Sequence, residues 1–270
     1  MKLLNGKELA GYIQERQAKQ VRALRQARGV FPKLAIIRTN PDPVVDSYMK
    51  LKQNYGTDIL IDVEVHTVDQ AEALERIAAL NADLNVHGII VQIPLPDPAR
   101  TTETLNAVAA EKDVDGLAEN TLFEPATPMA IDWLLAGYNI DLATKHIVIV
   151  GHGRLVGRPL AALWRSNGFD VEVVDKSVES LKAVTQNADV LVTATGAPGL
   201  IKRDMVKDSV VIVDAGVATD SNGLVGDVAP EVRELPNITI TPEKGGVGPL
   251  TVCALFENVI RAAQRVAEKQ

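Results

Sequence analysis

The sequence predicts an α/β protein with two α/β domains. Short apolar segments of strand length alternate with amphipathic helical segments along almost the whole chain. This alternation is typical of parallel sheets whose faces are covered by helices. The chain has 270 residues, 46% of them hydrophobic, and this length suits about two domains.

The first half of the chain is predicted to form a β-α-β-α-β lobe. An amphipathic helix over 7–28 precedes the lobe and ends at Gly29 and Pro32, because both residue types stop helices. Apolar runs then predict three strands with two helices between them. The strands cover 34–37, 59–65 and 87–92, and the helices cover about 44–54 and 69–82.

A second α/β series is predicted in the other half of the chain. Its strands are expected over 146–150, 170–174, 190–193, 210–213 and 238–240, and its helices over 128–136, 155–166 and 250–267. No Gly/Ser linker marks a boundary, so the motifs place it near 122–128. We expect one domain over 1–122, completed by the C-terminal helix at 250–270, and a second over 123–249.

Composition excludes several classes of function. The formal net charge is −7, whereas nucleic-acid binding needs clustered positive charge. No apolar run approaches the ~20 residues of a membrane span, and the N-terminus lacks the apolar segment of a signal peptide. The one cysteine, Cys253, excludes an intrachain disulfide and suits the cytoplasm. The histidines show no metal-ligand spacing, so no metal site is expected: His66, His87, His146 and His152.

A glycine-rich turn follows the first strand of the second series. The glycines at 151, 153 and 157 form a G-x-G-x-x-x-G pattern between a strand and a helix, one residue longer than the common dinucleotide fingerprint. Such a turn brings backbone N–H groups and a helix N-terminus to a pyrophosphate, although it can also be purely structural. It predicts a Rossmann-type doubly wound dinucleotide-binding domain, with cofactor contacts from Gly151, His152, Gly153, Arg154, Val156 and Gly157.

Asp175 ends the next predicted strand and is followed by Lys176. A carboxylate ~20 residues after the first glycine can hold the adenosine ribose hydroxyls, and the alternative is an ordinary turn aspartate. Two later turns of small residues also follow strands, and such turns line the ligand crevice of open α/β sheets or are turns alone. Their candidate cofactor-binding residues are Thr195, Gly196, Gly216 and Val217.

Tyr48 and Lys52 are four residues apart on a predicted helix and therefore share one face. Such a pair is usually a surface contact, but the segment 45–52 resembles the Ser-x-x-Tyr-x-x-x-Lys pattern of methylene-tetrahydrofolate dehydrogenase/cyclohydrolases, with Val45 at the serine position. Three further segments resemble motifs of this family in the same order. They are Gly-Ile-Ile-Val-Gln-Ile-Pro-Leu-Pro at 88–96, Lys-Asp-Val-Asp-Gly at 112–116 and Lys-Gly-Gly-Val-Gly-Pro-Leu-Thr at 244–251.

The resemblance implies an active site in a cleft between the two domains. Lys52 would be the general acid/base and would activate water for the cyclohydrolase step. Gln92 would hydrogen-bond Lys52, Tyr48 would pack against the pterin, and Asp115 would accept hydrogen bonds from the pterin amino group and ring N–H. A carboxylate and an aromatic ring suit the donor edge and the flat face of a pterin. The glycine loop would pass close to the folate and the nicotinamide through Gly246, Val247, Gly248 and Pro249.

The implied activity is oxidation of 5,10-methylene-tetrahydrofolate with NAD or NADP, followed by hydrolysis to 10-formyl-tetrahydrofolate. A homodimer is typical of the family. Where NADP-using relatives commonly have Arg-Ser, this chain has His152-Gly153, and Asp175 ends the second strand, so we expect NAD rather than NADP. Ala126 and Ala130 replace the family's usual cysteine and glycine.

Three alternatives remain open at the level of sequence. The first is a member of the same family with the dehydrogenase activity alone. The second is another two-domain dehydrogenase, acting on an amino or hydroxy acid, although the motifs at 112–116 and 245–248 argue against it. The third is a non-catalytic dinucleotide-binding sensor on the same fold, which would have no use for Lys52 and Gln92.

Overall fold

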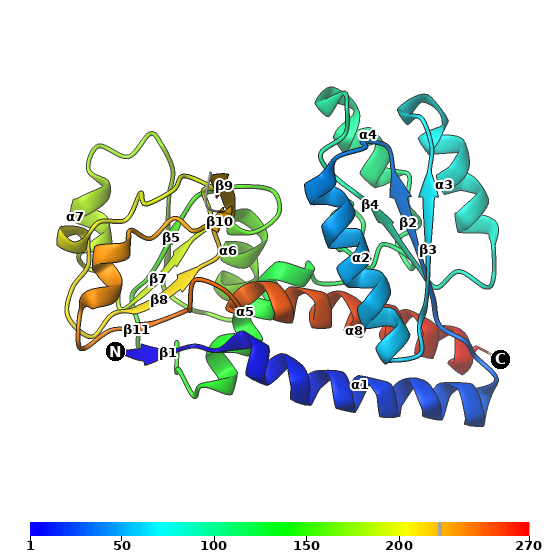
Figure 1. Cartoon of the computed structure of the whole chain (residues 1–270), viewed down its shortest axis with the longest axis horizontal. Coiled ribbons are helices and arrows are strands. Elements are labelled where there is room, and N and C mark those ends of the chain that lie inside the picture. Colours follow the sequence, from blue (N-terminus) through cyan, green and yellow to red (C-terminus); the bar gives the residue numbers. More distant parts are fainter. Residues whose placement is uncertain (221–222, 270) are drawn as a thin grey trace. The chain divides into compact units, whose positions relative to one another are not determined.

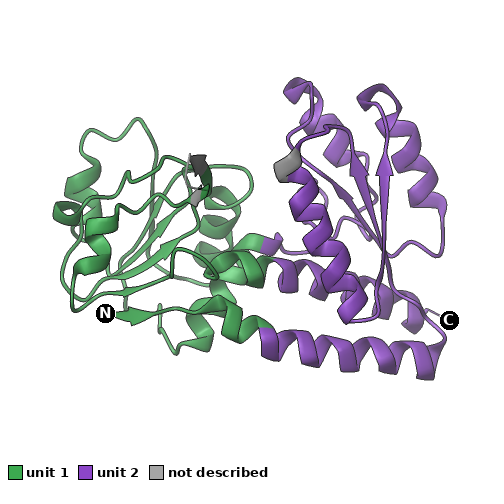
Figure 2. Ribbon diagram, in the orientation of Figure 1, with its two compact units in different colours: residues 1–10, 127–251 green, residues 11–126, 252–270 purple. Residues whose placement is uncertain are grey.

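The computed structural model describes residues 1–220 and 223–269. The chain folds into two compact units (Figure 2). Unit 1 comprises Met1–Ala10 and Thr127–Thr251, and unit 2 comprises Gly11–Ala126 and Val252–Gln270. The boundaries therefore fall inside α1 (Gly6–Arg28) and α8 (Val247–Glu268) and at the first residue of α5 (Ala126–Gly137).

Unit 1 contains, among the described residues, a six-stranded parallel sheet in the order β1-β11-β8-β7-β5-β6. Its central strands are short runs of Val, Ile and Leu that are almost completely buried, as expected for a sheet with helices on its faces. This is the predicted doubly wound architecture (Figure 1). The strands are β1 (Lys2–Leu3), β5 (Ile147–Val150), β6 (Val171–Val174), β7 (Val190–Thr193), β8 (Val211–Asp214) and β11 (Thr239–Ile240).

The N-terminal strand differs from the predicted domain limits, because residues 1–10 group with unit 1. β1 pairs in parallel with β11, where Lys2 lies opposite Thr239, and Leu4 is completely buried. A strand of two residues carries no periodic signal, so sequence patterns could not find it. Residues 123–126 group with unit 2 instead of the second predicted domain.

Unit 2 contains a three-stranded parallel sheet in the order β3-β2-β4 among its described residues. The strands are β2 (Lys33–Arg38), β3 (Asp62–Thr67) and β4 (Gly88–Val91). Side chains alternate across the sheet, and one face packs Ala35 and Ile37 against Ile77 of α3 (Ala73–Ala82). The opposite face bears α2 (Pro43–Asp58), because Arg38 forms an ion pair with Asp46 at 2.5 Å.

A buried polar network ties α2 to α1 and α8 within unit 2. The Tyr55 hydroxyl of α2 donates to Oε1 of Gln17 on α1 at 2.7 Å, and it also contacts the Cys253 sulfur of α8 at 3.1 Å. Gln17 Nε2 donates to the Cys253 carbonyl at 2.8 Å. Burial raises the pKa of Tyr55, so this hydroxyl remains a donor. The network fixes α2, which carries Tyr48 and Lys52.

The remaining elements are short, and most lack a strong sequence signal. The predicted strand at 59–65 begins only at Asp62, because residues 59–61 turn after α2 and Leu60 has a φ of 66°. The last helix begins three residues earlier than predicted, inside the glycine loop. Sequence patterns missed α4 (Thr101–Asn106), α7 (Leu181–Thr185) and the antiparallel pair β9 (Ala218–Asp220) and β10 (Gly223–Val225).

One further α-helix and four short 3-10 helices complete the fold of the described residues. α6 (Gly157–Ser166) lies between β5 and β6 in the chain. The short 3-10 helices are η1 (Gln70–Glu72), η2 (Pro98–Arg100), η3 (Arg203–Met205) and η4 (Pro230–Glu234). Across the described residues, we find no helix that is both long enough and apolar enough to cross a membrane.

Candidate active site

Lys52 and Gln92 meet in unit 2. Lys52 lies on α2 and Gln92 directly follows β4, and Lys52 Nζ donates to Gln92 Oε1 at 3.0 Å. Gln92 Nε2 donates to the Ile93 carbonyl at 3.0 Å, which fixes the orientation of the amide with its oxygen toward the lysine. The sequence predicts this contact, and the structure places the two side chains together.

Burial controls the charge of Lys52. Desolvation lowers the pKa of the ammonium, and the Asp115 carboxylate opposes it by raising that pKa. Desolvation likewise raises the pKa of Asp115, while the Lys52 charge lowers it. Lys52 and Asp115 are both partly exposed, so their charged groups are largely surrounded by protein but remain accessible to solvent. Lys52 is therefore easier to deprotonate than a lysine in water.

The loop that carries Asp115 is anchored on both sides. Asp113 Oδ2 accepts the Ala118 N–H at 2.9 Å. Nδ2 of the completely buried Asn258 on α8 donates to the carbonyls of Val114 and Glu124, each at 2.9 Å. Asn258 was not found from the sequence, since a lone asparagine in a C-terminal helix carries no motif.

Lys112, the first residue of the same motif, has a structural function. Its Nζ donates to the carbonyls of Leu80, Asn81 and Asp83 at 2.7–3.0 Å, which satisfies the C-terminal end of α3. The lysine therefore fixes the start of the Asp113–Gly116 loop against α3.

Tyr48 lies one helical turn before Lys52 on α2. Its side chain is 37% exposed, so the ring has a face available to a ligand. Val45, at the position where the resemblance expects serine, is 8% exposed and packs into the core. Asp42 Oδ1 accepts the Val45 N–H at 3.1 Å, so the start of the helix does not need a serine there.

The glycine turn in unit 1 brings the start of α6 against strand β5. Gly151 has a φ of 104°, and a Cβ at Gly157 would lie 1.8 Å from the Gly151 carbonyl oxygen. Only glycine permits both features. The N-cap residue of α6, Val156, makes no side-chain capping bond. In the first turn of the helix, the Arg158 N–H donates to the Gly153 carbonyl at 3.0 Å and Pro159 has no N–H, so Gly157 supplies the N–H that can meet an anion. The helix begins two residues later than predicted, because 154–156 form a turn.

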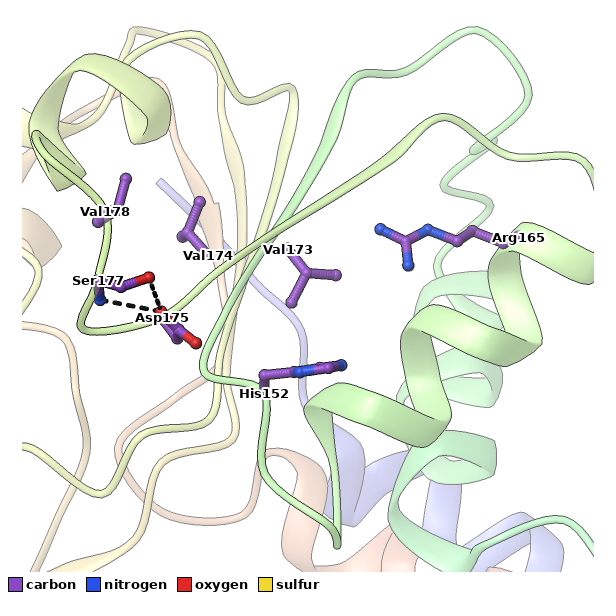
Figure 3. Close-up of a pocket in the computed structure, with 7 residues that line it drawn as sticks. All are labelled: His152, Arg165, Val173, Val174, Asp175, Ser177 and Val178. Atoms are coloured by element: carbon purple, nitrogen blue, oxygen red, sulfur yellow. Dashed lines mark hydrogen bonds between the residues drawn. The ribbon is translucent and has the colours of Figure 1, made fainter.

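A pocket of ≈340 Å³ lies beside this turn (Figure 3). Ser177 donates its N–H at 2.9 Å and its hydroxyl at 2.6 Å to Oδ1 of the exposed Asp175. These two bonds lower the pKa of Asp175, and the nearby Lys176 charge lowers it further. The second carboxylate oxygen points away from Ser177 (Figure 3). The lining residues are His152, Arg165, Val173, Val174, Asp175, Ser177 and Val178.

The sequence predicted His152 and Asp175 in this region, but it missed Arg165 and Ser177. Arg165 lies near the end of α6 and donates through Nε and a terminal nitrogen to the Val171 carbonyl at 3.3 and 2.9 Å. Arg165 lies outside the glycine motif, so the motif could not predict that it lines the pocket. Ser177 follows Asp175 by two residues, and an Asp-x-Ser pattern after a strand could have predicted this turn.

The other two predicted turns lie next to each other at the carboxyl ends of the neighbouring strands β7 and β8. β7 and β8 pair in parallel with Thr193 opposite Asp214, so the segments after them, which hold Gly196 and Gly216, emerge from neighbouring strands. Val217 is 59% exposed. These turns depend on two buried carboxylates that the sequence did not single out, Asp214 and Asp227.

The glycine loop before α8 belongs to unit 1. Lys7 N–H donates to the Gly245 carbonyl at 2.9 Å, which ties the loop to the start of α1. The helix begins at Val247, so Gly248 and Pro249 lie in its first turn. Ala126 and Ala130, which replace the family's cysteine and glycine, are 3% and 0% exposed, so both positions are filled by small buried side chains.

Two features define the class of this protein. Unit 1 has a doubly wound parallel sheet with a glycine turn after β5. Unit 2 is an α/β unit in which Lys52 hydrogen-bonds Gln92 and interacts electrostatically with Asp115. The class is that of two-domain, nicotinamide-dinucleotide oxidoreductases. The chain belongs to the tetrahydrofolate dehydrogenase/cyclohydrolase family: the family's catalytic-domain model matches residues 4–115, and its NAD(P)-binding-domain model matches residues 125–267.

Curated relatives and solved structures agree with this membership. The bifunctional protein FolD of Methanosarcina barkeri is 38% identical over 97% of this chain and 96% of its own length. The corresponding protein of Thermus thermophilus is also 38% identical, over 97% and 95%. The crystal structure of the bifunctional FolD enzyme from Campylobacter jejuni superposes with a TM-score of 0.92 at 35% identity, covering 98% of this chain and 99% of that one.

A further solved structure is described as a complex with cofactor. It is the dehydrogenase-cyclohydrolase of Trypanosoma brucei with NADP and an inhibitor, which has a TM-score of 0.90 at 27% identity and covers 97% of both chains. The predicted family and fold class are therefore confirmed.

Proposed function

We propose that this chain oxidises 5,10-methylene-tetrahydrofolate to the 5,10-methenyl form with a nicotinamide dinucleotide and then hydrolyses the product to 10-formyl-tetrahydrofolate. Relatives named for both activities support this function over the dehydrogenase-only and sensor alternatives. The observation that carries the proposal is the Lys52–Gln92 hydrogen bond, together with the Asp115 carboxylate whose charge raises the pKa of Lys52.

Lys52 is the proposed general base of the hydrolytic step. Burial lowers its pKa, so a neutral amine is accessible for removing a proton from water as the water oxygen bonds to the methenyl carbon. The same nitrogen can then return the proton to the ring nitrogen as the bond between that nitrogen and the carbon breaks, and the second proton of the former water is released to solvent as the formyl carbonyl forms. The Gln92 amide oxygen holds Nζ at 3.0 Å and orients it.

Asp115 and Tyr48 are the proposed contacts to the pterin. Asp115 lies on a loop anchored through Asn258, so its carboxylate is held for a ligand with paired N–H donors. Tyr48 offers a partly exposed ring on the same helix face as Lys52. We also assign Gly246, Val247, Gly248 and Pro249 to ligand contacts. Gly248 is exposed in the first turn of α8, where backbone N–H groups have no partner within the helix.

The dinucleotide fits the glycine turn of unit 1. The close approach of Gly157 to Gly151 and the Gly157 N–H at the start of α6 suit a pyrophosphate. When bound, the nicotinamide accepts a hydride from the methylene carbon. The chain's own residues bind and orient it, and we assign this function to the residues predicted from the sequence: Gly151, His152, Gly153, Arg154, Val156, Gly157, Asp175, Lys176, Thr195, Gly196, Gly216 and Val217.

We further propose that the chain prefers NAD⁺ to NADP⁺. Ser177 occupies one oxygen of Asp175, and the other points away from Ser177, where it can accept hydrogen bonds from ribose hydroxyls. A 2′-phosphate at the same place would face a like charge. Lys176 and Arg165 are the local positive charges that oppose this preference.

The assembly and location are proposed from the family resemblance. We propose that the chain acts in the cytoplasm as a homodimer. A single cysteine, which is buried as Cys253, fits a reducing compartment. Sedimentation analysis at several concentrations tests the dimer, and a monomer throughout would contradict it.

Turnover assays test the proposed function directly. Methylene-tetrahydrofolate is incubated with NAD⁺ and NADP⁺ in parallel, and methenyl-tetrahydrofolate is incubated without dinucleotide. We expect turnover in both kinds of assay and a higher kcat/KM with NAD⁺. Oxidation without methenyl hydrolysis would leave a dehydrogenase-only enzyme, and dinucleotide binding without any turnover would leave a sensor.

A further inference from the structure

Two buried aspartates in unit 1 contact each other's neighbouring glycines. A Cβ at Gly216 would lie 2.1 Å from the Asp227 carboxyl carbon, and a Cβ at Gly226 would lie 2.1 Å from Asp214 Oδ2. Neither glycine has a positive φ, so glycine is required at both positions because a carboxylate approaches closely. Each aspartate therefore packs against the segment that carries the other.

Asp214 is saturated with hydrogen bonds and ties several segments together. Its Oδ1 accepts the N–H groups of Gly216 at 3.2 Å and Asp227 at 3.0 Å, and the Thr193 hydroxyl at 3.2 Å. Its Oδ2 accepts the Val228 N–H at 3.1 Å. The side chain is 4% exposed, and these bonds account for its burial.

Asp227 is different, because only part of its carboxylate has a partner. Its Oδ2 accepts the Thr195 N–H at 2.7 Å. The residue is 0% exposed, and its Oδ1 has no hydrogen-bond partner. An unpaired buried oxygen costs free energy, so stability alone does not account for an aspartate here. A single side chain contacts both the turn after β7 and the turn after β8.

The order of the strands indicates which part of the dinucleotide these turns receive. Asp175 follows β6, the glycine turn follows β5, and the turns at Thr195 and Gly216 follow β7 and β8. Neighbouring strands are ~4.8 Å apart, and ligands bind outside the carboxyl ends of such sheets. An extended dinucleotide with its adenosine at Asp175 and its pyrophosphate at Gly151 therefore brings its nicotinamide half to the turns after β7 and β8.

We propose that Asp227 is a positioning residue for the nicotinamide half of the dinucleotide. It holds the Thr195 amide and packs flat against Gly216, and so sets the backbone of both turns that receive this half. The assignment rests on the proposed cofactor-binding role of Thr195, Gly196, Gly216 and Val217.

Asp227→Ala and Asp227→Asn test this assignment on the full chain. In Asp227→Ala the Thr195 N–H loses its acceptor, and we expect the KM and Kd for the dinucleotide to rise about 10-fold. Asp227→Asn keeps an oxygen that can accept this N–H, so we expect a change within about threefold. Methenyl hydrolysis without dinucleotide should remain within about twofold of wild type in both. Asp208→Ala, which removes an exposed aspartate of the same unit, is the matched control.

A second variant keeps the test valid if Asp227→Ala is poorly folded. Gly216→Ala places a methyl group 2.1 Å from the Asp227 carboxyl carbon, and we expect it to weaken dinucleotide binding in the same way. Because Asp227→Ala removes that carboxyl group, the double variant should bind no more weakly than the worse single variant. Multiplicative effects would show that the two residues act independently and would overturn the proposal.

The other outcomes are equally decisive. An unchanged dinucleotide Kd in a folded Asp227→Ala protein would overturn the proposal, and so would an equal loss of both activities, which marks a general structural role. Failure of the wild-type protein to turn over methylene-tetrahydrofolate would contradict the proposed function instead. The dinucleotide Kd, measured by titration calorimetry, still compares the variants in that case.

Discussion

Asp115 and Lys52 set each other's charge, because the Asp115 carboxylate raises the pKa of Lys52 against the desolvation that lowers it. The same pair works in the opposite direction on Asp115, whose pKa burial raises and Lys52 lowers. A lysine that must both accept and return a proton benefits from this balance. Too little desolvation would keep the Lys52 amine protonated. Too little negative charge nearby would lower its pKa further and make it a weaker base.

The pH dependence of methenyl hydrolysis follows from this pair. The neutral amine is the active form, so the rate rises as pH passes upward through the Lys52 pKa, which lies below the ordinary value of 10.5. Asp115→Asn removes the charge that raises this pKa and should move the rising limb to lower pH. The measurement is the pH profile of kcat at saturating substrate. Glu119→Gln, at an exposed site, should leave the limb unmoved, and an upward shift in Asp115→Asn would contradict the assignment.

Asp115→Ala should weaken folate binding without changing the dinucleotide Kd. Loss of one charge-assisted hydrogen bond costs about 1.5–3 kcal/mol, or roughly 10-fold to 150-fold in Kd. The measurement is calorimetric titration with each ligand alone. A weaker dinucleotide with intact folate binding would reverse the proposed placement of the two ligands.

Strand and helix patterns predicted the main part of the fold. Parallel strands such as Ile147–Val150 are continuous apolar runs, and this signal is strong. The two-residue β1 and the five-residue α7 are too short to have a period. Their positions depend on pairing with β11 and on packing, which no local pattern records.

The candidate site divides in the same way. Tyr48, Lys52, Gln92 and Asp115 lie in segments with recognisable motifs, and the structure places Lys52 against Gln92. Arg165 and Asp227 of unit 1 and Asn258 of unit 2 lie in no such motif. The partners of Asp227 and Asn258 are distant in the chain, and Arg165 joins the pocket lining of unit 1 from the end of α6.

Asn258→Ala should destabilise unit 2 and weaken folate binding together. The variant leaves the buried carbonyl of Val114 and the partly buried carbonyl of Glu124 without their donor, at a cost of about 1–3 kcal/mol. The loop that carries Asp115 then loses its anchor, so the KM for folate should rise. Denaturant unfolding and kinetics check both effects. Asn54→Ala, at an exposed position of α2, is the control. An unchanged folate KM in a destabilised Asn258→Ala protein would contradict the prediction, because it would show that Asn258 does not position Asp115 for folate.

Asp175→Ser should increase the use of NADP⁺. Two unit charges ~4 Å apart repel by roughly 1 kcal/mol in water and ~4 kcal/mol at an effective dielectric of about 20, and a 2′-phosphate carries almost two charges. The measurement is kcat/KM for both dinucleotides in wild type, in Asp175→Ser and in the control Glu179→Ser, which changes an exposed carboxylate outside the pocket lining. A wild-type preference for NADP⁺, or no gain of NADP⁺ use in Asp175→Ser, would refute the proposed preference.

The most direct test of the account is methenyl hydrolysis by Lys52→Met beside Lys50→Met. The two lysines lie on the same helix, but only Lys52 is partly buried and bonded to Gln92, whereas Lys50 is exposed. Loss of a general acid/base lowers the rate by about 10²-fold or more, so we expect that loss in Lys52→Met, with unfolding unchanged, and near wild-type hydrolysis in Lys50→Met. Near wild-type hydrolysis in a folded Lys52→Met protein would contradict the central claim.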